Sequence, residues 1–191
     1  MALTRLGPNN STNISGINLT SQVTGTLPTA NGGTGATSFS PGKILQVVSS
    51  ESTTVDTFQN VDWTNSSISV SITPSNSSNK IYVLANVTVS HGNHGNLRLT
   101  KDGTAISVGA SSGSRPAVAG YMNLTGDNAA GCFVLQSLHS AGGTSAITYR
   151  VQVKSDNSSS TAGYINRTVN DTNAVYGGRS VSIITAMEVS A

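Results

Sequence analysis

The residues best suited by type to do chemistry are the three histidines of the chain, and two of them are close together. His91 and His94 flank Gly92-Asn93 at the end of a predicted strand, and His139 is the third. A zinc site takes at least three protein ligands, so His139 would have to approach this pair from a loop. A metal site is the alternative interpretation of these histidines. We expect a histidine-bearing loop that contacts a ligand or a neighbouring subunit, and no metal or other cofactor.

The acidic residues and serines do not form a recognisable catalytic motif. Hydrolysis of a glycosidic bond ordinarily uses two carboxylates placed across the sugar, and the acids fall mostly in predicted loops without a paired motif. No G-x-S-x-G sequence is present, although that motif marks the nucleophile of one large hydrolase class. Gly32-Gly33-Thr34-Gly35 lacks the G-K-[ST] ending of a phosphate-binding loop. We therefore expect no catalytic residues and no enzyme.

A binding surface is a better match to these residue types. The aromatic side chains of Trp63, Tyr121 and Tyr176 could stack on sugar rings, while Asn, Ser and Arg side chains supply hydrogen bonds. Each aromatic also has an alternative role in the core or in a subunit interface. The residues that we expect in receptor-facing loops are His91, His94, Tyr121, Tyr176 and Arg179.

Composition argues against several other classes of protein. Charged residues make up only 9% of the 191 residues, and the net charge is +2, against about 25% charged residues in a typical domain. The Lys and Arg residues are scattered, so nucleic-acid binding is not expected. No apolar stretch approaches the roughly 18 residues of a membrane span, and no signal peptide is expected. Cys132 is the only cysteine, and we expect it to be a buried hydrophobic residue.

The chain changes character near residue 42. Residues 1–42 contain few large apolar residues, and Pro8, Pro28 and Pro41 disfavour regular helix there. Ordering about 40 backbones costs roughly 40–80 kcal/mol, whereas burying about eight apolar side chains returns only roughly 12–24 kcal/mol. We therefore expect an extended N-terminal arm that is ordered by contacts with other subunits or with a larger particle.

Residues 43–191 alternate between apolar and polar residues, which is typical of half-buried strands. No segment has the apolar period of a helix, and Asp102-Gly103 predicts a tight hairpin. The pattern therefore predicts an all-β fold, namely an antiparallel β-sandwich of the jelly-roll kind. The predicted strands cover residues 44–48, 61–63, 68–72, 80–90, 97–100, 105–108, 130–138, 147–154, 164–167 and 180–190.

The segment Thr24–Ser38, TGTLPTANGGTGATS, resembles a motif found near the N-terminus of tail fibres and related virion fibres of tailed bacteriophages. The block SVSITPSNSSNKIYVLANVTV, the hairpin LRLTKDGTAI and the C-terminal stretch from Ile165 are similar, more weakly, to the head domains of such fibres. The resemblance implies homotrimers in which intertwined arms precede a knob of three sandwiches. The arm residues expected to act in assembly are Leu27, Pro28, Asn31, Gly32, Gly33 and Gly35.

The resemblance leads us to expect a virion structural protein that is assembled in the cytoplasm of a host bacterium. The favoured function is a trimeric tail fibre with an arm that docks on other virion proteins and a head that binds a host-surface glycan. One alternative is a capsid decoration, cement or head-fibre protein with an arm that stabilises the capsid. A glycan-degrading enzyme is the remote alternative.

Overall fold

The computed structural model describes residues 43–124, 126–156 and 162–191. The chain divides into two units, Met1–Pro41 and Gly42–Ala191, and the account below concerns the second. The predicted assembly residues, from Leu27 to Gly35, lie outside the described residues.

The body is an all-β protein with two antiparallel sheets and, in the described residues, no helix. The first, sheet A, has six strands. Strand β4 lies at its centre, with β8 on one edge and both β11 and β10 along the other; β1 flanks β11, and β2 flanks β10. These strands are β1 (Ile44–Ser52), β2 (Thr57–Phe58), β4 (Lys80–His91), β8 (Gly131–Ser140), β10 (Gly163–Ile165) and β11 (Ser182–Val189).

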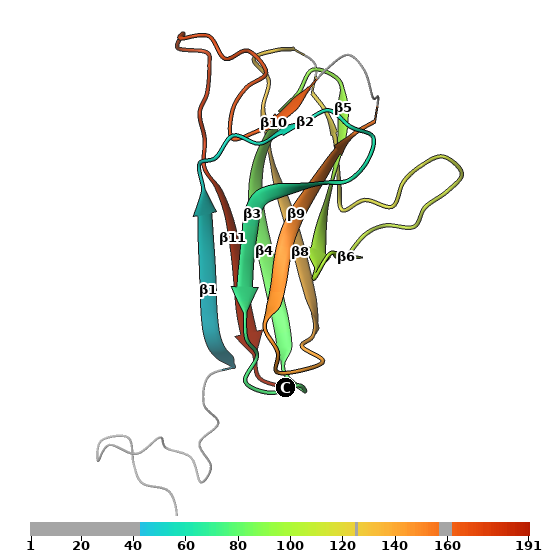
Figure 1. Cartoon of the computed structure of the whole chain (residues 1–191), viewed down its shortest axis with the longest axis vertical. Coiled ribbons are helices and arrows are strands. Elements are labelled where there is room, and N and C mark those ends of the chain that lie inside the picture. The colour runs from blue at the N-terminus through green and yellow to red at the C-terminus, as the bar shows by residue number, and fades with distance from the viewer. Residues whose placement is uncertain (1–42, 125, 157–161) are drawn as a thin grey trace, which may run out of the picture. The chain divides into compact units, whose positions relative to one another are not determined.

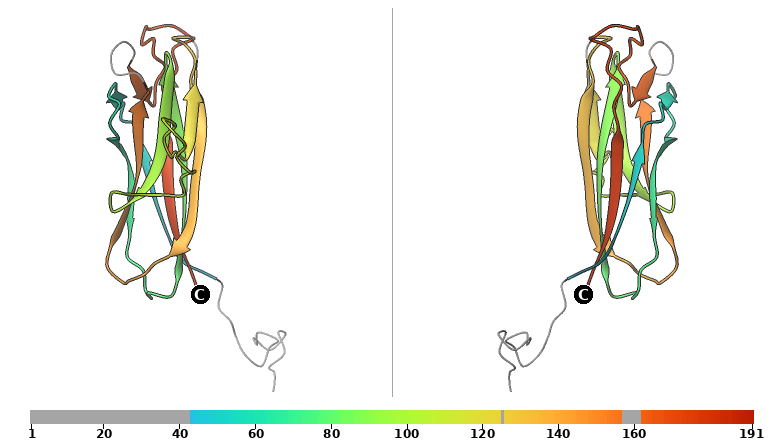
Figure 2. Two further views of the ribbon diagram at one scale, coloured as in Figure 1. Left: turned by 90° about the vertical axis from the view of Figure 1, so that its right-hand side faces the viewer. Right: turned by 90° about the vertical axis from the view of Figure 1, so that its left-hand side faces the viewer.

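The second, sheet B, has five strands. Their order is β3, β9 and β5, followed by β7 and β6, which share the far edge of β5. Figures 1 and 2 show the long strands of both sheets running along one common axis. The strands of sheet B are β3 (Thr64–Ile72), β5 (His94–Lys101), β6 (Thr104–Ile106), β7 (Gly120–Asn123) and β9 (Ile147–Ser155).

The apolar residues of alternating strands form the core between the two sheets. Successive side chains of a strand point to opposite faces, and in β4 the residues of one face, from Ile81 to Val89, are completely buried. The predicted apolar face of β9, from Ile147 to Val153, is also buried. The prediction of an antiparallel β-sandwich is therefore confirmed.

The predicted hairpin at Asp102-Gly103 is also confirmed. These residues join β5 to β6 and have φ angles of 48° and 84°. Two successive positive φ angles are characteristic of the type I′ turn, which follows the right-handed twist of the strands. The Asp102 Oδ1 atom accepts a hydrogen bond of 2.8 Å from the backbone N–H of Thr148, which ties the turn to β9.

Three local predictions are wrong. Val61–Trp63 is a loop, and the strand expected there begins at Thr64 instead. Residues 120–123, which are outside the predicted strands, form β7 and pair with β5. Cys132 is exposed rather than buried, because alternation along β8 turns the neighbouring Phe133 and Leu135 toward the core.

The two ends of the described chain meet at one end of the sandwich, at the bottom of Figure 1. The backbone N–H of Ser190 donates to the Lys43 carbonyl, and that of Ala191 donates to the Asn79 side chain. At this end Glu188 is only 1% exposed. Its carboxylate accepts hydrogen bonds from the Asn79 and Gln46 side chains, from the N–H and hydroxyl of Ser75 and from the N–H of Asn76.

These hydrogen bonds keep the Glu188 carboxylate ionised. Burial raises the pKa of this group, but the hydrogen bonds from Asn79, Gln46 and Ser75 outweigh burial and lower the pKa to about 2 from an ordinary value of 4.5. A carboxyl group with a lower pKa in the folded than in the unfolded state stabilises the fold at neutral pH. Glu188 therefore joins β1, β11 and the β3–β4 loop through one charge.

We predict that Glu188→Gln lowers the free energy of unfolding by about 2–4 kcal/mol, because an amide cannot accept all of these hydrogen bonds. Urea unfolding at pH 7 measures this. The wild type should lose stability as the pH falls from about 4.5 toward 2, and the variant should lose less over this range. Glu51→Gln, at an exposed position, is the control and should change stability by less than about 0.5 kcal/mol. Equal effects of the two substitutions would contradict the assignment.

Candidate functional site

The outer face of sheet B carries a row of three polar side chains from neighbouring strands. Asn96 on β5 lies opposite Tyr121 on β7 and opposite Lys154 on β9. Directly opposite residues of paired strands have Cβ atoms about 4.5–5.5 Å apart. The pairing register therefore brings an aromatic ring, a carboxamide and an ammonium group together.

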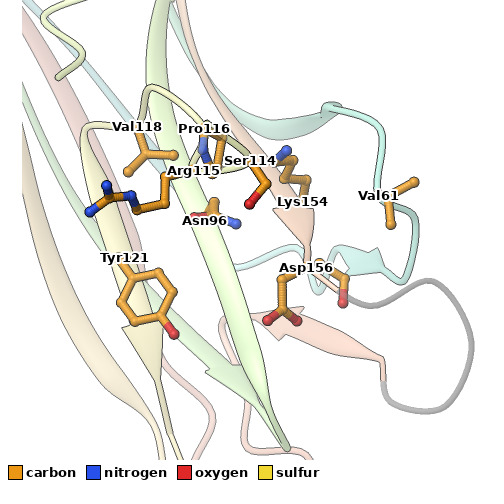
Figure 3. Close-up of a pocket in the computed structure, with 10 residues that line it drawn as sticks. Val61, Asn96, Ser114, Arg115, Pro116, Val118, Tyr121, Lys154 and Asp156 are labelled. Carbon is orange, nitrogen blue, oxygen red and sulfur yellow. The ribbon is translucent and has the colours of Figure 1, made fainter. Parts of the chain in front are cut away.

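The loop between β6 and β7 turns this row into a pocket. A hydrogen bond from the Gly109 N–H to the Val118 carbonyl joins the two sides of the loop, and one from the Ala119 N–H to the Leu97 carbonyl ties the loop to β5. The pocket has a volume of about 540 Å³ and is lined on the loop side by Ser114, Arg115 and Pro116. Figure 3 shows Asn96 at its centre, with Tyr121 on one side and Lys154 and Asp156 on the other.

The Asn96 side chain lies in the wall of the pocket without a side-chain hydrogen bond to the described residues. It is only 3% exposed, and within the described part of the chain no side-chain hydrogen bond joins its carboxamide to another group. Its carboxamide atoms are not among the fully buried, unpaired side-chain atoms of the described residues, which are the Ser90 and Ser180 hydroxyls, so water reaches the carboxamide from the pocket. A carboxamide offers two donors and an acceptor. An unpaired one on a pocket wall is therefore available to a ligand.

Charged and aromatic groups border the pocket toward the upper end of the sandwich. The His94 Nδ1 atom lies 3.0 Å from an Asp156 carboxylate oxygen. The His94 ring also stacks on the ring of Tyr121, with centroids 5.9 Å apart and an interplanar angle of 19°. Tyr121 is 56% exposed, so part of its ring is open to a ligand.

Cations gather beside the pocket. The Arg98 guanidinium lies 4.1 Å from the centroid of the Trp63 ring, and the Lys154 Nζ atom lies 5.2 Å from it. Burial lowers the pKa of Arg98, yet a guanidinium stays charged in proteins. Within the described residues, neither of these cations nor Arg115 has an acidic side chain within ion-pair distance. Asp156 is the one acidic residue among the described residues of the pocket lining, and more cations than carboxylates lie around it.

This arrangement can bind a polar ligand that has an apolar face. A saccharide has C–H groups on one face of the ring and hydroxyls at the edge. The Tyr121 ring offers a stacking surface. The Asn96 carboxamide donates and accepts hydrogen bonds, Asp156 accepts from hydroxyls, and Lys154 donates to oxygen atoms.

The structure places the predicted receptor-facing residues at three different locations. His94 and Tyr121 lie together beside the pocket, in β5 and β7 rather than in loops. His91 is not in a loop. It is the last residue of β4 and is 1% exposed. Its ring accepts a hydrogen bond from the Asn93 N–H and contacts the Ser155 hydroxyl at 3.1 Å. Burial lowers the pKa of His91, and the side chain is not available at the surface.

Tyr176 and Arg179 lie in the long loop between β10 and β11, away from the pocket. The Asp171 carboxylate accepts two hydrogen bonds from one Arg179 nitrogen, at 2.6 and 2.8 Å, and lies 3.4 Å from Arg167. This ion-pair cluster braces the loop. Tyr176 and the preceding Val175 remain exposed at the loop tip.

The three histidines do not converge. The His139 Nε2 atom is hydrogen-bonded to the Tyr149 hydroxyl at 2.8 Å, in the lower half of the sandwich. Burial and nearby Lys101 lower the pKa of His139. In the described part of the chain, no group of three or more His, Cys, Asp or Glu residues is placed to hold a metal ion.

Among the described residues that line the pocket, Tyr121 is the one that was predicted to face a receptor; the amide and charged residues Asn96, Arg115, Lys154 and Asp156 were not predicted. The alternation predicted over residues 147–154 placed Lys154 on the polar face of its strand, whereas Asn96 lay just before the predicted strand 97–100. The alternation did not indicate that β5 and β9 are neighbours in the register that joins these two residues. Arg115 comes from a loop whose path no local pattern predicts.

Comparisons with known proteins add no relatives. No protein-family model matches the chain, and no curated protein matches it. Within the described residues, no helix is long and apolar enough to cross a membrane.

We predict that Asn96→Leu changes the free energy of unfolding by less than about 1 kcal/mol, because the Asn96 carboxamide makes no side-chain hydrogen bond to the described residues that the substitution could break. Asn79→Leu is the matched control, since Asn79 is 6% exposed and makes three side-chain hydrogen bonds. It should cost about 2–4 kcal/mol. Urea unfolding compares the two, and a similar loss for both would show that Asn96 has a structural partner.

Proposed function

We propose that this chain is a virion structural protein of a tailed bacteriophage, most specifically a tail fibre with a head that binds a host-surface glycan. The N-terminal arm docks on other virion proteins, and three chains form the fibre. Three heads on one fibre, and several fibres on one particle, raise the avidity of weak sites without any new contact. Localisation in the virion follows from this role.

The strand order supports a jelly-roll head. Across sheet A the strands run β1, β11, β4 and β8, and across sheet B they run β3, β9, β5 and the short strand β7. Eight antiparallel strands divided in this way between two packed sheets match the double Greek key of a jelly roll, a fold used by capsid proteins and lectins. Because unrelated functions share this fold, it supports the proposal only weakly.

The observation that carries the glycan-binding proposal is the unpartnered Asn96 carboxamide in the wall of the sheet B pocket. A saccharide hydroxyl would form hydrogen bonds with this carboxamide in place of the water in the pocket. The neighbouring ring of Tyr121 supplies a stacking surface in the same row of the sheet.

The charges beside the pocket favour an anionic saccharide. Lys154 and Arg115 line the pocket and lack an acidic partner within the described residues. A carboxylate on the sugar would pair with one of them by a charge-assisted hydrogen bond. Asp156, held by His94, is left to accept hydrogen bonds from hydroxyl groups.

Binding without hydrolysis agrees with the residues around the pocket. Glycoside hydrolysis by a retaining or inverting mechanism ordinarily uses two carboxylates on opposite sides of the scissile bond. Of the described residues that line this pocket, Asp156 alone is acidic. Release of reducing sugar from a host polysaccharide would revive the enzyme alternative.

The positions of Lys43 and of the pocket region at opposite ends of the sandwich also support attachment through the N-terminal side. Residues 1–42 join the body at Lys43, at the same end as the C-terminus. The beginning of β5, with His94, and the loop that carries Tyr176 lie toward the opposite end (Figure 1). A docked arm would thus leave these groups pointing away from the attachment point.

A capsid decoration or head-fibre protein is the second candidate. The apolar outer surface of sheet A, described below, could equally be covered by a capsid protein. A virion reconstruction separates the two roles. A tail fibre occurs in few copies at the tail, whereas a decoration protein covers the capsid in many copies.

We predict that the full-length protein binds oligogalacturonate more tightly than a neutral galacto-oligosaccharide of the same length. Trp63, the only tryptophan, lies next to Lys154, so its fluorescence is the measurement. Lys154→Gln should weaken oligogalacturonate binding about tenfold, in keeping with the loss of one charge-assisted hydrogen bond.

Arg150→Gln is the control for this experiment, because Arg150 lies in another row of β9 and is not one of the residues that line the pocket. It should leave the affinity within about twofold, a change of roughly 0.4 kcal/mol. Equal effects of the two substitutions, or tighter binding of the neutral sugar, would contradict the anionic preference. Failure to bind either sugar, and failure of the protein to block phage adsorption to host cells, would remove the glycan-binding proposal.

A further inference from the structure

The outer faces of the two sheets differ in chemistry although both follow the same alternation. The outward residues of sheet B are nearly all polar, as expected for an antiparallel sheet with one face in water. The outward residues of sheet A are largely apolar. We call this surface the A face. Its residues are Leu45, Val47, Ser49, Glu51, Tyr82, Leu84, Asn86, Thr88, Cys132, Val134, Gln136, Leu138, Ile183, Thr185, Met187 and Val189.

The apolar residues of the A face are continuous across the sheet. One row crosses four strands from Val47 through Met187 and Tyr82 to Leu138. Val47 and Leu138 are 55% and 57% exposed. Exposed apolar side chains that occur singly are normal, but a continuous patch marks an interaction site.

A groove deepens the A face at the end where the termini meet. It has a volume of about 540 Å³, and its apolar wall comes from Ile44, Tyr82, Leu138, Met187 and Val189. Lys43, at which residues 1–42 join the body, is also in its lining. One end of the A face therefore lies at the junction between residues 1–42 and the body.

From this surface we propose that the A face is where copies of this chain pack on one another. The inference rests on the homotrimer of the proposed function and identifies the surface through which its heads associate. Four strands at about 4.8 Å spacing and ten residues at about 3.3 Å each define a flat area of roughly 600 Å². Because side chains protrude from the sheet, the accessible area of this face is larger than its flat area and approaches the roughly 800 Å² per partner of a standard interface.

A second copy fits this face better than the arm of the same chain. An extended segment is about one strand wide, roughly 5 Å, so one segment lying along the face cannot cover a row that crosses four strands. The face also carries few charges, since Glu51 and Lys80 are the charged residues at the outward positions of its described strands, and Lys43 lies beside them in the groove. Copies with a net charge of only +2 repel one another weakly.

The test compares Leu138→Glu with Val175→Glu in the full-length protein by sedimentation equilibrium. Val175 is fully exposed in the β10–β11 loop and is the matched control for adding a charge at an exposed apolar position. We expect an oligomer for the wild type and for Val175→Glu, and a monomer for Leu138→Glu at the same micromolar concentration. A monomeric wild type, or a Leu138→Glu variant that stays oligomeric, would overturn the inference.

The native thiol provides a second measurement on the same protein. Cys132 lies on the A face opposite Thr88 and is exposed in the single chain. Its reaction with a maleimide should be at least tenfold slower in the wild-type oligomer than in Leu138→Glu. Near-ultraviolet circular dichroism from Trp63 checks that the variant is folded. An oligomer with a freely reactive Cys132 would mean that another segment, such as the arm, holds the copies together, and would also overturn the inference.

The saccharide measurement separates this inference from the proposed function. The pocket lies on the outer face of sheet B, so Leu138→Glu should bind oligogalacturonate with unchanged affinity per site. If neither the wild type nor Leu138→Glu binds the sugar, but Leu138→Glu is still a monomer, the glycan-binding proposal fails and the A face assignment stands. If Leu138→Glu binds the sugar normally and remains oligomeric, the A face assignment fails alone.

Discussion

Burial of one face of every long strand between the two sheets is the constraint from which the other features follow. A pleated strand has only two faces, so a strand that gives one to the core leaves the other free. In β4, β5 and β9 the core face is almost entirely aliphatic, with Tyr149 as the large exception. Glu188 is a charge in this inner layer, and it is tolerated because five hydrogen bonds replace its water.

The outer faces are where the two sheets acquire different properties. Sheet B places amides, hydroxyls and cations outward, and the β6–β7 loop encloses part of that surface as a pocket. Sheet A places apolar side chains outward in a continuous row. One sheet face is thus suited to a hydrated ligand and the other to a dry protein contact, and the core between them holds the two surfaces apart.

Much of the fold could be predicted because alternation is local. The strands near Ile81, Leu97 and Ile147 were correctly predicted from period-two patterns, and Asp102-Gly103 correctly marked a hairpin. The prediction was wrong at Cys132, because an apolar run in β8 contains residues of both faces and the pattern does not say which face is inward. The short strand β7 was missed because its Gly-Tyr-Met-Asn sequence is too brief to show a period.

The candidate site was only partly predictable. His94 and Tyr121 stood out by type, but Asn96 and Lys154 are ordinary polar residues whose importance comes from their shared row. The all-β class, the hairpin and the scarcity of charge could be predicted from the chain alone, since these depend on backbone propensity and on composition. The pairing of the strands, the apolar residues that stay on the outer surface and the place of Asn96 in a pocket wall could not be predicted, because each depends on contacts between residues far apart in the chain.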